Sequence, residues 1–116
     1  MSQLLLAIIL FALAAVNGLI LATCFFRARP RPFPLAMVHL TFAAAGLATL
    51  ALFVWKDQTI LLANIALAIM CVVAFIGFIQ LSFRLRGKEL ITPLLIFHAL
   101  SAITGFLVLL VAFLMT

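Results

Sequence analysis

The chain contains two histidines, His39 and His98, and both lie in long apolar stretches. An imidazole can ligate a metal or haem iron, carry a proton, or form a hydrogen bond between helices. Ionisable side chains inside apolar membrane segments are costly to bury, so they usually face the protein interior and have an identifiable partner. The two histidines are therefore the first candidates for functional residues.

The sequence around the two histidines occurs twice. Pro34–His39 (PLAMVH) aligns with Pro93–His98 (PLLIFH). Each histidine is followed by an alanine four positions on and a glycine three positions after that, which are Ala43 and Gly46 in the first copy and Ala102 and Gly105 in the second. Positions i, i+4 and i+7 share one helix face, so each imidazole is expected on a stripe with small residues.

A second match precedes the first. Phe26–Arg29 (FRAR) aligns with Phe83–Arg86 (FRLR), and the histidine segments then come into register if the second loop is two residues longer than the first. The chain is therefore predicted to consist of two tandem two-helix repeats, related by a pseudo-twofold axis along the membrane normal.

Composition places these repeats in a membrane. Of the 116 residues, 70% are hydrophobic and 8% are charged, which is far from the composition of soluble domains. Four apolar stretches are long enough to cross the hydrocarbon core of a bilayer, at about residues 4–26, 34–55, 60–83 and 90–115. The first stretch has no preceding positive region, so we expect a retained helix there and not a cleaved signal peptide.

The charged residues lie in the loops and predict an orientation. Lys56 is on one side of the membrane, and the other six basic residues are on the opposite side: Arg27, Arg29, Arg31, Arg84, Arg86 and Lys88. The positive-inside rule makes the second side cytoplasmic, with both termini outside, as in the periplasm for a bacterial inner-membrane protein. Cations confined to loops, without interleaved exposed aromatics, do not indicate nucleic-acid binding.

Short loops make neighbouring helices antiparallel. The predicted fold is therefore an all-α, up-and-down four-helix bundle that forms a single transmembrane domain over residues 1–116. Each histidine follows its proline by five residues, which places both roughly 7 to 8 Å below the cytoplasmic helix ends. In such a bundle the second and fourth helices are diagonal, at roughly 13 Å.

That spacing suits a haem whose iron is bonded to both His39 and His98. The small residues on the histidine stripes would leave room for the porphyrin, and nearby arginines would meet its propionates. Besides the histidines, the predicted cofactor-binding residues are Ala43, Gly46, Ala102, Gly105, Arg27, Arg84 and Arg86. A ligand histidine also needs a partner for its second ring nitrogen, and Asn17 and Gln80 are candidates for such contacts.

Histidines paired on antiparallel membrane helices, with glycines on the same faces, resemble the arrangement in small four-helix integral-membrane b-type cytochromes. The resemblance lies in His39, His98, Gly46 and Gly105 and in the architecture, and it implies one bis-histidine haem b per chain. Many such proteins have two histidine pairs at two depths, whereas this chain has one, so electron transfer across the whole membrane is not expected of a monomer. Six-coordinate iron implies electron transfer, with a quinone, superoxide or a redox protein as partner.

Other interpretations of the histidines stay open at this point. They could join helices by hydrogen bonds, with glycine and alanine allowing close packing, or they could serve a different metal, substrate or proton. The chain would then be a small non-redox membrane protein, such as an accessory subunit of a larger complex or a transporter-like homo-oligomer. An acid–base or nucleophilic enzyme is not indicated, because the only acids, Asp57 and Glu89, lie in loops on opposite faces.

Overall fold

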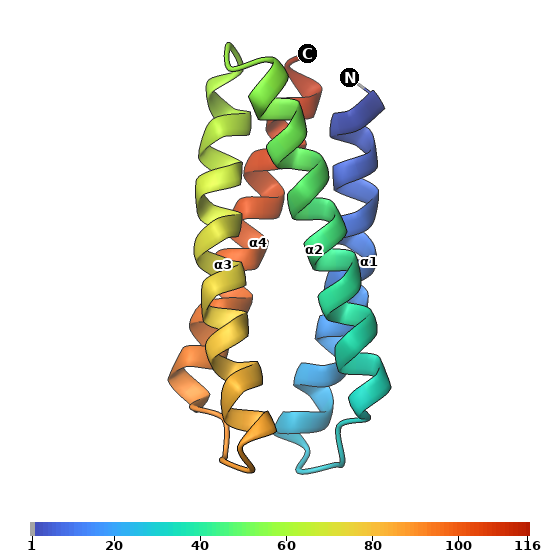
Figure 1. Cartoon of the computed structure of the whole chain (residues 1–116), viewed down its shortest axis with the longest axis vertical. Coiled ribbons are helices and arrows are strands. Elements are labelled where there is room, and N and C mark those ends of the chain that lie inside the picture. Colours follow the sequence, from blue (N-terminus) through green and yellow to red (C-terminus); the bar gives the residue numbers. More distant parts are fainter. Residues whose placement is uncertain (1) are drawn as a thin grey trace. The chain divides into compact units, whose positions relative to one another are not determined.

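Four α-helices make up the computed structural model, which describes residues 2–116 (Figure 1). They are α1 (Ser2–Phe26), α2 (Phe33–Lys56), α3 (Leu61–Leu85) and α4 (Thr92–Leu114). Each predicted span agrees with its helix to within two residues at either end. The four helices confirm the all-α prediction. All four are long and apolar enough to cross a membrane, which agrees with an integral membrane protein.

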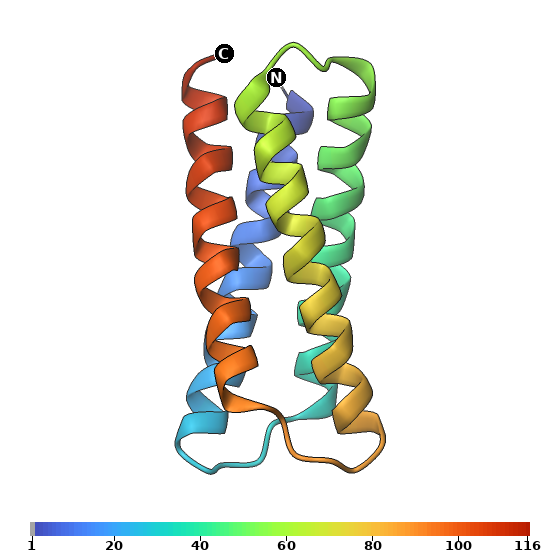
Figure 2. The same cartoon turned by 90° about the vertical axis from the view of Figure 1, so that its left-hand side faces the viewer.

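The helices pair as two hairpins, α1 with α2 and α3 with α4. Figure 2 shows, at its lower end, the loop that closes each hairpin. Contacts divide the chain into two compact units, Met1–Phe53 and Val54–Thr116, so each hairpin is described by itself. The assembly of both hairpins into one up-and-down bundle over residues 1–116 stays a prediction from the sequence.

The two hairpins share one register. α1 ends at Phe26 and α3 at Leu85, while α2 begins at Phe33 and α4 at Thr92, so these boundaries recur after 59 residues. The predicted difference of two residues between the loops is therefore wrong. The FRAR and FRLR segments look alike because both carry arginines near a helix end. In the structure, however, Phe26 corresponds to Leu85, and Phe83 lies more than half a helical turn before Leu85.

Both hairpin loops begin with the same helix cap. After α1, the Ala28 N–H donates to the Phe25 carbonyl and the Arg29 N–H to the Cys24 carbonyl; after α3, Gly87 and Lys88 donate in the same way to Arg84 and Phe83. This is the Schellman motif, whose C′ residue must adopt the left-handed conformation. Its φ angle is 53° at Ala28 and 69° at Gly87, so alanine occupies in the first loop a conformation that suits glycine.

The core of the first hairpin runs along one stripe of each helix. Its buried residues are Leu4, Ala7, Ile8, Phe11 and Ala14 in α1, and Gly46, Leu50 and Phe53 in α2. The ring of Phe11 fills the space beside Gly46, where an added Cβ would lie 3.1 Å from the ring atoms. A glycine at this position lets the aromatic ring pack against the backbone of α2, as is common between membrane helices.

The second hairpin repeats this core with different side chains. Its buried residues are Ala63, Ala66, Met70, Val73, Ile76 and Gln80 in α3, and Gly105, Leu109 and Ala112 in α4. Gly105 corresponds to Gly46, and a Cβ there would lie 3.0 Å from Ile69 and 3.1 Å from the Met70 sulfur. Met70 thus takes the place of Phe11.

Gln80 joins α3 to the start of α4. Its side-chain Nε2 donates to the Ile91 carbonyl at 3.2 Å, and the Ile91 N–H donates to its Oε1 at 3.4 Å. The side chain is 6% exposed, so these two bonds compensate for the burial of its amide. Leu21 occupies the equivalent position of the first hairpin and has no side-chain polar group to form such hydrogen bonds.

A polar turn connects α2 to α3. The Thr59 hydroxyl and N–H both donate to the Asp57 carboxylate, at 2.6 and 3.0 Å, and these bonds lower the pKa of Asp57. Such an Asx-type turn is a common way to reverse a chain over few residues.

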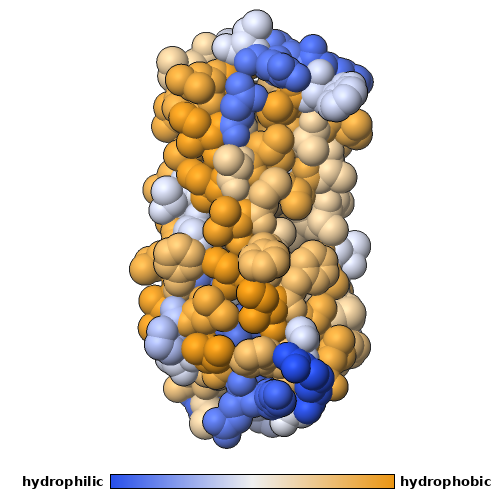
Figure 3. Space-filling model, turned by 60° about the vertical axis from the view of Figure 1, so that its left-hand side comes forward, coloured by the Kyte–Doolittle hydropathy of each residue, from blue (hydrophilic) through white to orange (hydrophobic). Residues whose placement is uncertain are grey.

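Apolar side chains cover most of the helix surfaces. On the face drawn in Figure 3, the hydrophobic residues lie along the helices and most hydrophilic residues gather at the helix ends. Leu19 and Phe75 are 70% and 66% exposed. Exposed apolar surface on this scale belongs in contact with lipid, because a water-soluble protein rarely exposes it.

We predict opposite stability effects for Ala28→Gly and Gly87→Ala. A left-handed non-glycine residue costs roughly 1–2 kcal/mol, partly offset by the greater unfolded-state entropy of glycine. No atom lies within 4 Å of a Cβ built on Gly87, so only the backbone conformation is at stake. Ala28→Gly should raise the free energy of unfolding, and Gly87→Ala should lower it, each by about 1 kcal/mol. Circular dichroism during unfolding in mixed detergent micelles measures both; equal stability of Gly87→Ala and the parent chain would contradict the account.

Candidate functional site

His39 is bonded to the neighbouring helix of its own hairpin. Its Nδ1 lies 2.7 Å from the Ala14 carbonyl oxygen, and the ring is partly buried. In an α-helix that carbonyl already accepts the N–H of residue 18, so the imidazole uses the second lone pair of the oxygen. The bond joins α2 to α1 between two apolar helices that are candidate membrane spans.

His98 makes the same bond in the second hairpin. Its Nδ1 lies 3.0 Å from the Val73 carbonyl oxygen, and it too is partly buried. Ala14 and Val73 are 59 residues apart, as are the two histidines. Donor, acceptor and helix pairing therefore recur in register within each hairpin. A relation of the two histidines by one axis stays a prediction.

Two glycines open the path from each imidazole to its carbonyl. A Cβ added to Gly18 would lie 2.8 Å from Cε1 of His39, and one added to Gly77 would lie 3.1 Å from Cε1 of His98. Gly18 follows Ala14 by four residues, and Gly77 follows Val73 by four. Since the carbonyl of residue i points toward residue i+4, a side chain at these positions would occupy the space of the ring.

The hydrogen bonds determine which ring nitrogen carries the proton. A carbonyl oxygen only accepts, so Nδ1 of each neutral imidazole must be the N–H donor. Nε2 then carries the lone pair, which is the form in which a histidine binds a metal. Histidine ligands of metals commonly donate their other ring N–H to a backbone carbonyl, which holds the ring in place.

The small residues predicted on the histidine stripes lie in the hairpins as follows. Gly46 and Gly105 are buried against α1 and α3 side chains, as described above. Ala43 and Ala102 are partly exposed. Contact of these four residues with a porphyrin stays a prediction.

Asn17 and Gln80 bond to groups other than the histidine Nδ1 atoms. Asn17 Nδ2 donates to the Leu13 carbonyl of its own helix, at 2.8 Å. The Gln80 side chain forms its two hydrogen bonds with the backbone of Ile91. The acceptors of the histidine N–H groups are backbone carbonyls, which no side-chain pattern in the sequence marks directly.

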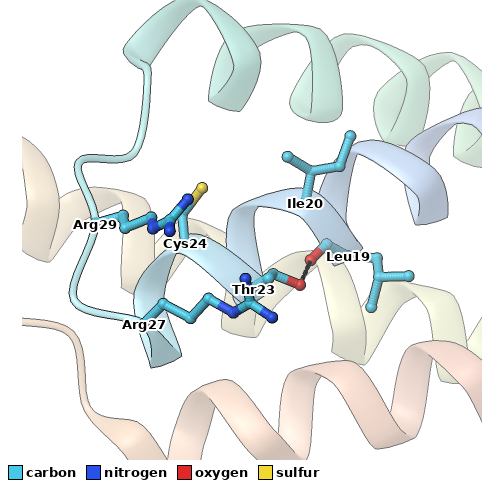
Figure 4. A pocket seen from close by; sticks show the side chains of 6 residues that line it. All are labelled: Leu19, Ile20, Thr23, Cys24, Arg27 and Arg29. Atoms are coloured by element: carbon cyan, nitrogen blue, oxygen red, sulfur yellow. Dashed lines mark hydrogen bonds between the residues drawn. The ribbon is translucent and has the colours of Figure 1, made fainter.

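The arginines near the hairpin loops have different surroundings. Arg27 and Arg29 line a pocket on α1 (Figure 4), whereas the Arg31 guanidinium lies over the Phe25 ring, 5.2 Å from its centroid. Arg86 donates from Nε to the Ser82 carbonyl at 3.3 Å and lies over Phe83. Propionate contacts of Arg27, Arg84 and Arg86 stay predictions.

Comparisons with known proteins do not supply a family. The chain matches no protein-family model, no curated protein sequence and no solved structure with which it was compared. Among the described residues, no group of three or more His, Cys, Asp or Glu side chains is gathered as a metal site.

The two imidazoles give a direct test of this geometry, because the chain has only two histidines. In protein without added haem, nitrogen NMR should show both rings in the Nδ1–H form. Gly18→Ala should displace the His39 signals and leave those of His98 in place, because its Cβ would enter the space of the first ring only.

The equivalent change Gly77→Ala should shift the His98 signals less, since the distance there is 3.1 Å and not 2.8 Å. Gly46→Ala is the control, because the three atoms nearest to its Cβ would all belong to Phe11. Rings in the Nε2–H form, or His39 signals that do not respond to Gly18→Ala, would contradict the hydrogen bonds.

Proposed function

We propose that this chain is a membrane b-type cytochrome in which His39 and His98 are the two axial ligands of one haem b, and that it transfers electrons. The single observation that carries the proposal is the repeated hydrogen bond from histidine Nδ1 to a backbone carbonyl, at 2.7 and 3.0 Å. It supports, once in each hairpin, the tautomer in which Nε2 would be the metal-binding atom.

The residues present fit a haem in their donor chemistry. Imidazole nitrogen is a common axial ligand of haem iron, and the surrounding helices are apolar. Each histidine is the sixth residue after the first residue of its helix, so both lie at the same distance from a helix start, roughly 9 Å by the helical rise. Arg27, Arg84 and Arg86 are the proposed contacts of the propionates.

When bound, the haem would supply a one-electron carrier. The chain's own residues would hold and tune it. The Ala14 and Val73 carbonyls would keep the two rings from rotating, and by accepting the Nδ1 proton they would make Nε2 more basic. A more basic ligand favours the oxidised metal, so these bonds would lower the reduction potential. Gly18 and Gly77 would act as positioning residues through the imidazoles.

The setting of this electron transfer is proposed from the sequence. By the positive-inside rule, the basic loops would face the cytoplasm of a bacterial inner membrane and both termini the periplasm. The haem would then lie near the cytoplasmic leaflet. A quinone, superoxide or a redox protein would exchange electrons with it, alone or within a homo-oligomer or larger membrane complex.

The same hydrogen bonds favour one competing function. An imidazole bonded to the neighbouring helix can simply hold a hairpin together, at a net contribution of about 1 kcal/mol in a membrane. The chain would then be a non-redox membrane protein, such as an accessory subunit. Haem binding separates the two, because only the cytochrome needs both Nε2 atoms for iron.

Absorption spectra of the protein purified in mild detergent test the proposal. The haem-loaded protein should show a sharp Soret band, with resolved α and β bands after dithionite reduction. His39→Ala or His98→Ala should each abolish this spectrum or convert it to a high-spin form, because each removes one axial ligand.

Thr41→Val and Thr104→Val are the control variants. Each removes a hydroxyl that donates only to the carbonyl four residues earlier on its own helix. Both variants should keep the low-spin spectrum. A protein that stays colourless when haem is supplied would rule out the cytochrome and leave the histidines as links between helices.

A positioning role predicts an effect of Gly18→Ala on haem affinity. Loss of the carbonyl bond should weaken haem binding about 10- to 100-fold, as is usual when a ligand histidine loses its hydrogen-bond partner. The stoichiometry and low-spin bands should persist, because Nε2 is retained. Haem titration followed by absorbance measures the affinity, and an unchanged value despite a displaced ring would show that the bond does not support a ligand.

A further inference from the structure

We propose that the surface of α1 near its C-terminal end binds an anionic phospholipid, with its phosphate between Arg27 and Arg29. A pocket of about 250 Å³ lies on the C-terminal part of α1. It is lined by Leu19, Ile20, Thr23, Cys24, Arg27 and Arg29. In Figure 4, both arginine side chains run back from the loop along α1 toward the apolar residues of the pocket.

The two arginines offer charge that the hairpin does not neutralise. Arg27 and Arg29 are exposed, and the segment from residue 1 to Lys56 contains no Asp or Glu. Guanidinium groups suit phosphate because their N–H groups match its oxygens in pairs. The Thr23, Cys24 and Phe25 carbonyls at the end of α1 are already hydrogen-bonded, because they accept the N–H groups of Arg27, Arg29 and Ala28.

The apolar wall identifies the ligand as a lipid and not as free phosphate. Ile20 precedes Arg27 by seven residues, roughly 10 Å along the helix axis, so the pocket extends from the charged loop into the apolar span. Leu19 is 70% exposed and continues this apolar surface. A molecule that meets both ends must carry a phosphate and an acyl chain. The net charge of the two guanidiniums favours an anionic headgroup over a zwitterionic one.

The second hairpin provides a matched control at equivalent positions. Arg86 and Lys88 correspond to Arg27 and Arg29 in the register of 59 residues. Arg86 is bonded to the Ser82 carbonyl and lies over Phe83, and Glu89 follows Lys88 in the chain. Arg86 is therefore engaged by groups of its own hairpin, and Lys88 has a carboxylate next to it in the sequence, so a lipid phosphate would gain less from this pair.

The test uses haem-free protein in detergent, titrated with dioleoylphosphatidylglycerol, and native mass spectrometry counts the bound lipid. One molecule should be retained. The double variant R27Q/R29Q should weaken its binding roughly thirtyfold, whereas R86Q/K88Q should change it far less. Dioleoylphosphatidylcholine and inorganic phosphate should both bind much more weakly. Equal effects of the two double variants, or equal binding of inorganic phosphate, would overturn the site.

A second measurement keeps the proposal testable if R27Q/R29Q does not fold. In a C71S background, Cys24 lies in the pocket as the remaining thiol. Phosphatidylglycerol should slow its alkylation by a maleimide several-fold, and phosphatidylcholine should not; no protection by phosphatidylglycerol would overturn the proposal. The proposal does not depend on the cytochrome, because both assays use protein without haem.

Discussion

The hydrogen bond between a histidine ring and a backbone carbonyl of the next helix is the constraint on which the rest of the structure depends. Inside a membrane, a buried N–H must find an acceptor, and helix carbonyls already bond within their own helix. A second lone pair on the Ala14 or Val73 oxygen is accessible only where the residue four positions later leaves space. Gly18 and Gly77 leave that space, and the register of each hairpin follows from it.

Once this register is set, the remaining contacts recur in the two hairpins. Gly46 and Gly105 face bulky side chains from the same position of the neighbouring helix, Phe11 in one case and Met70 in the other. Both loops start with a Schellman cap, although the first has Ala28 where the second has Gly87. The hairpins therefore share backbone geometry and the histidine bond, while the side chains around them differ.

Hydrophobicity alone was sufficient to predict the four helices, since lipid-exposed helices must be long and apolar along their whole length. The repeat of Pro, His, Ala and Gly located the histidines. The alignment of Phe26 with Phe83, however, matched the residues of α1 to the wrong residues of α3. Gly18 and Gly77 are separated by the same number of residues as the two histidines, and this spacing indicates the correct correspondence between the hairpins. The carbonyl acceptors could not be predicted, because a backbone oxygen leaves no residue type in the sequence and becomes visible only when two helices are packed.

A haem titration with parallel histidine variants tests the central claim most directly. If His39 and His98 are both ligands of one haem, absorbance should saturate at one haem per chain in the parent protein, and the double variant H39A/H98A should show no saturable binding. Identical titration curves for the parent and the double variant, or no binding by either, would contradict the cytochrome and leave the paired hydrogen bonds as purely structural links within each hairpin.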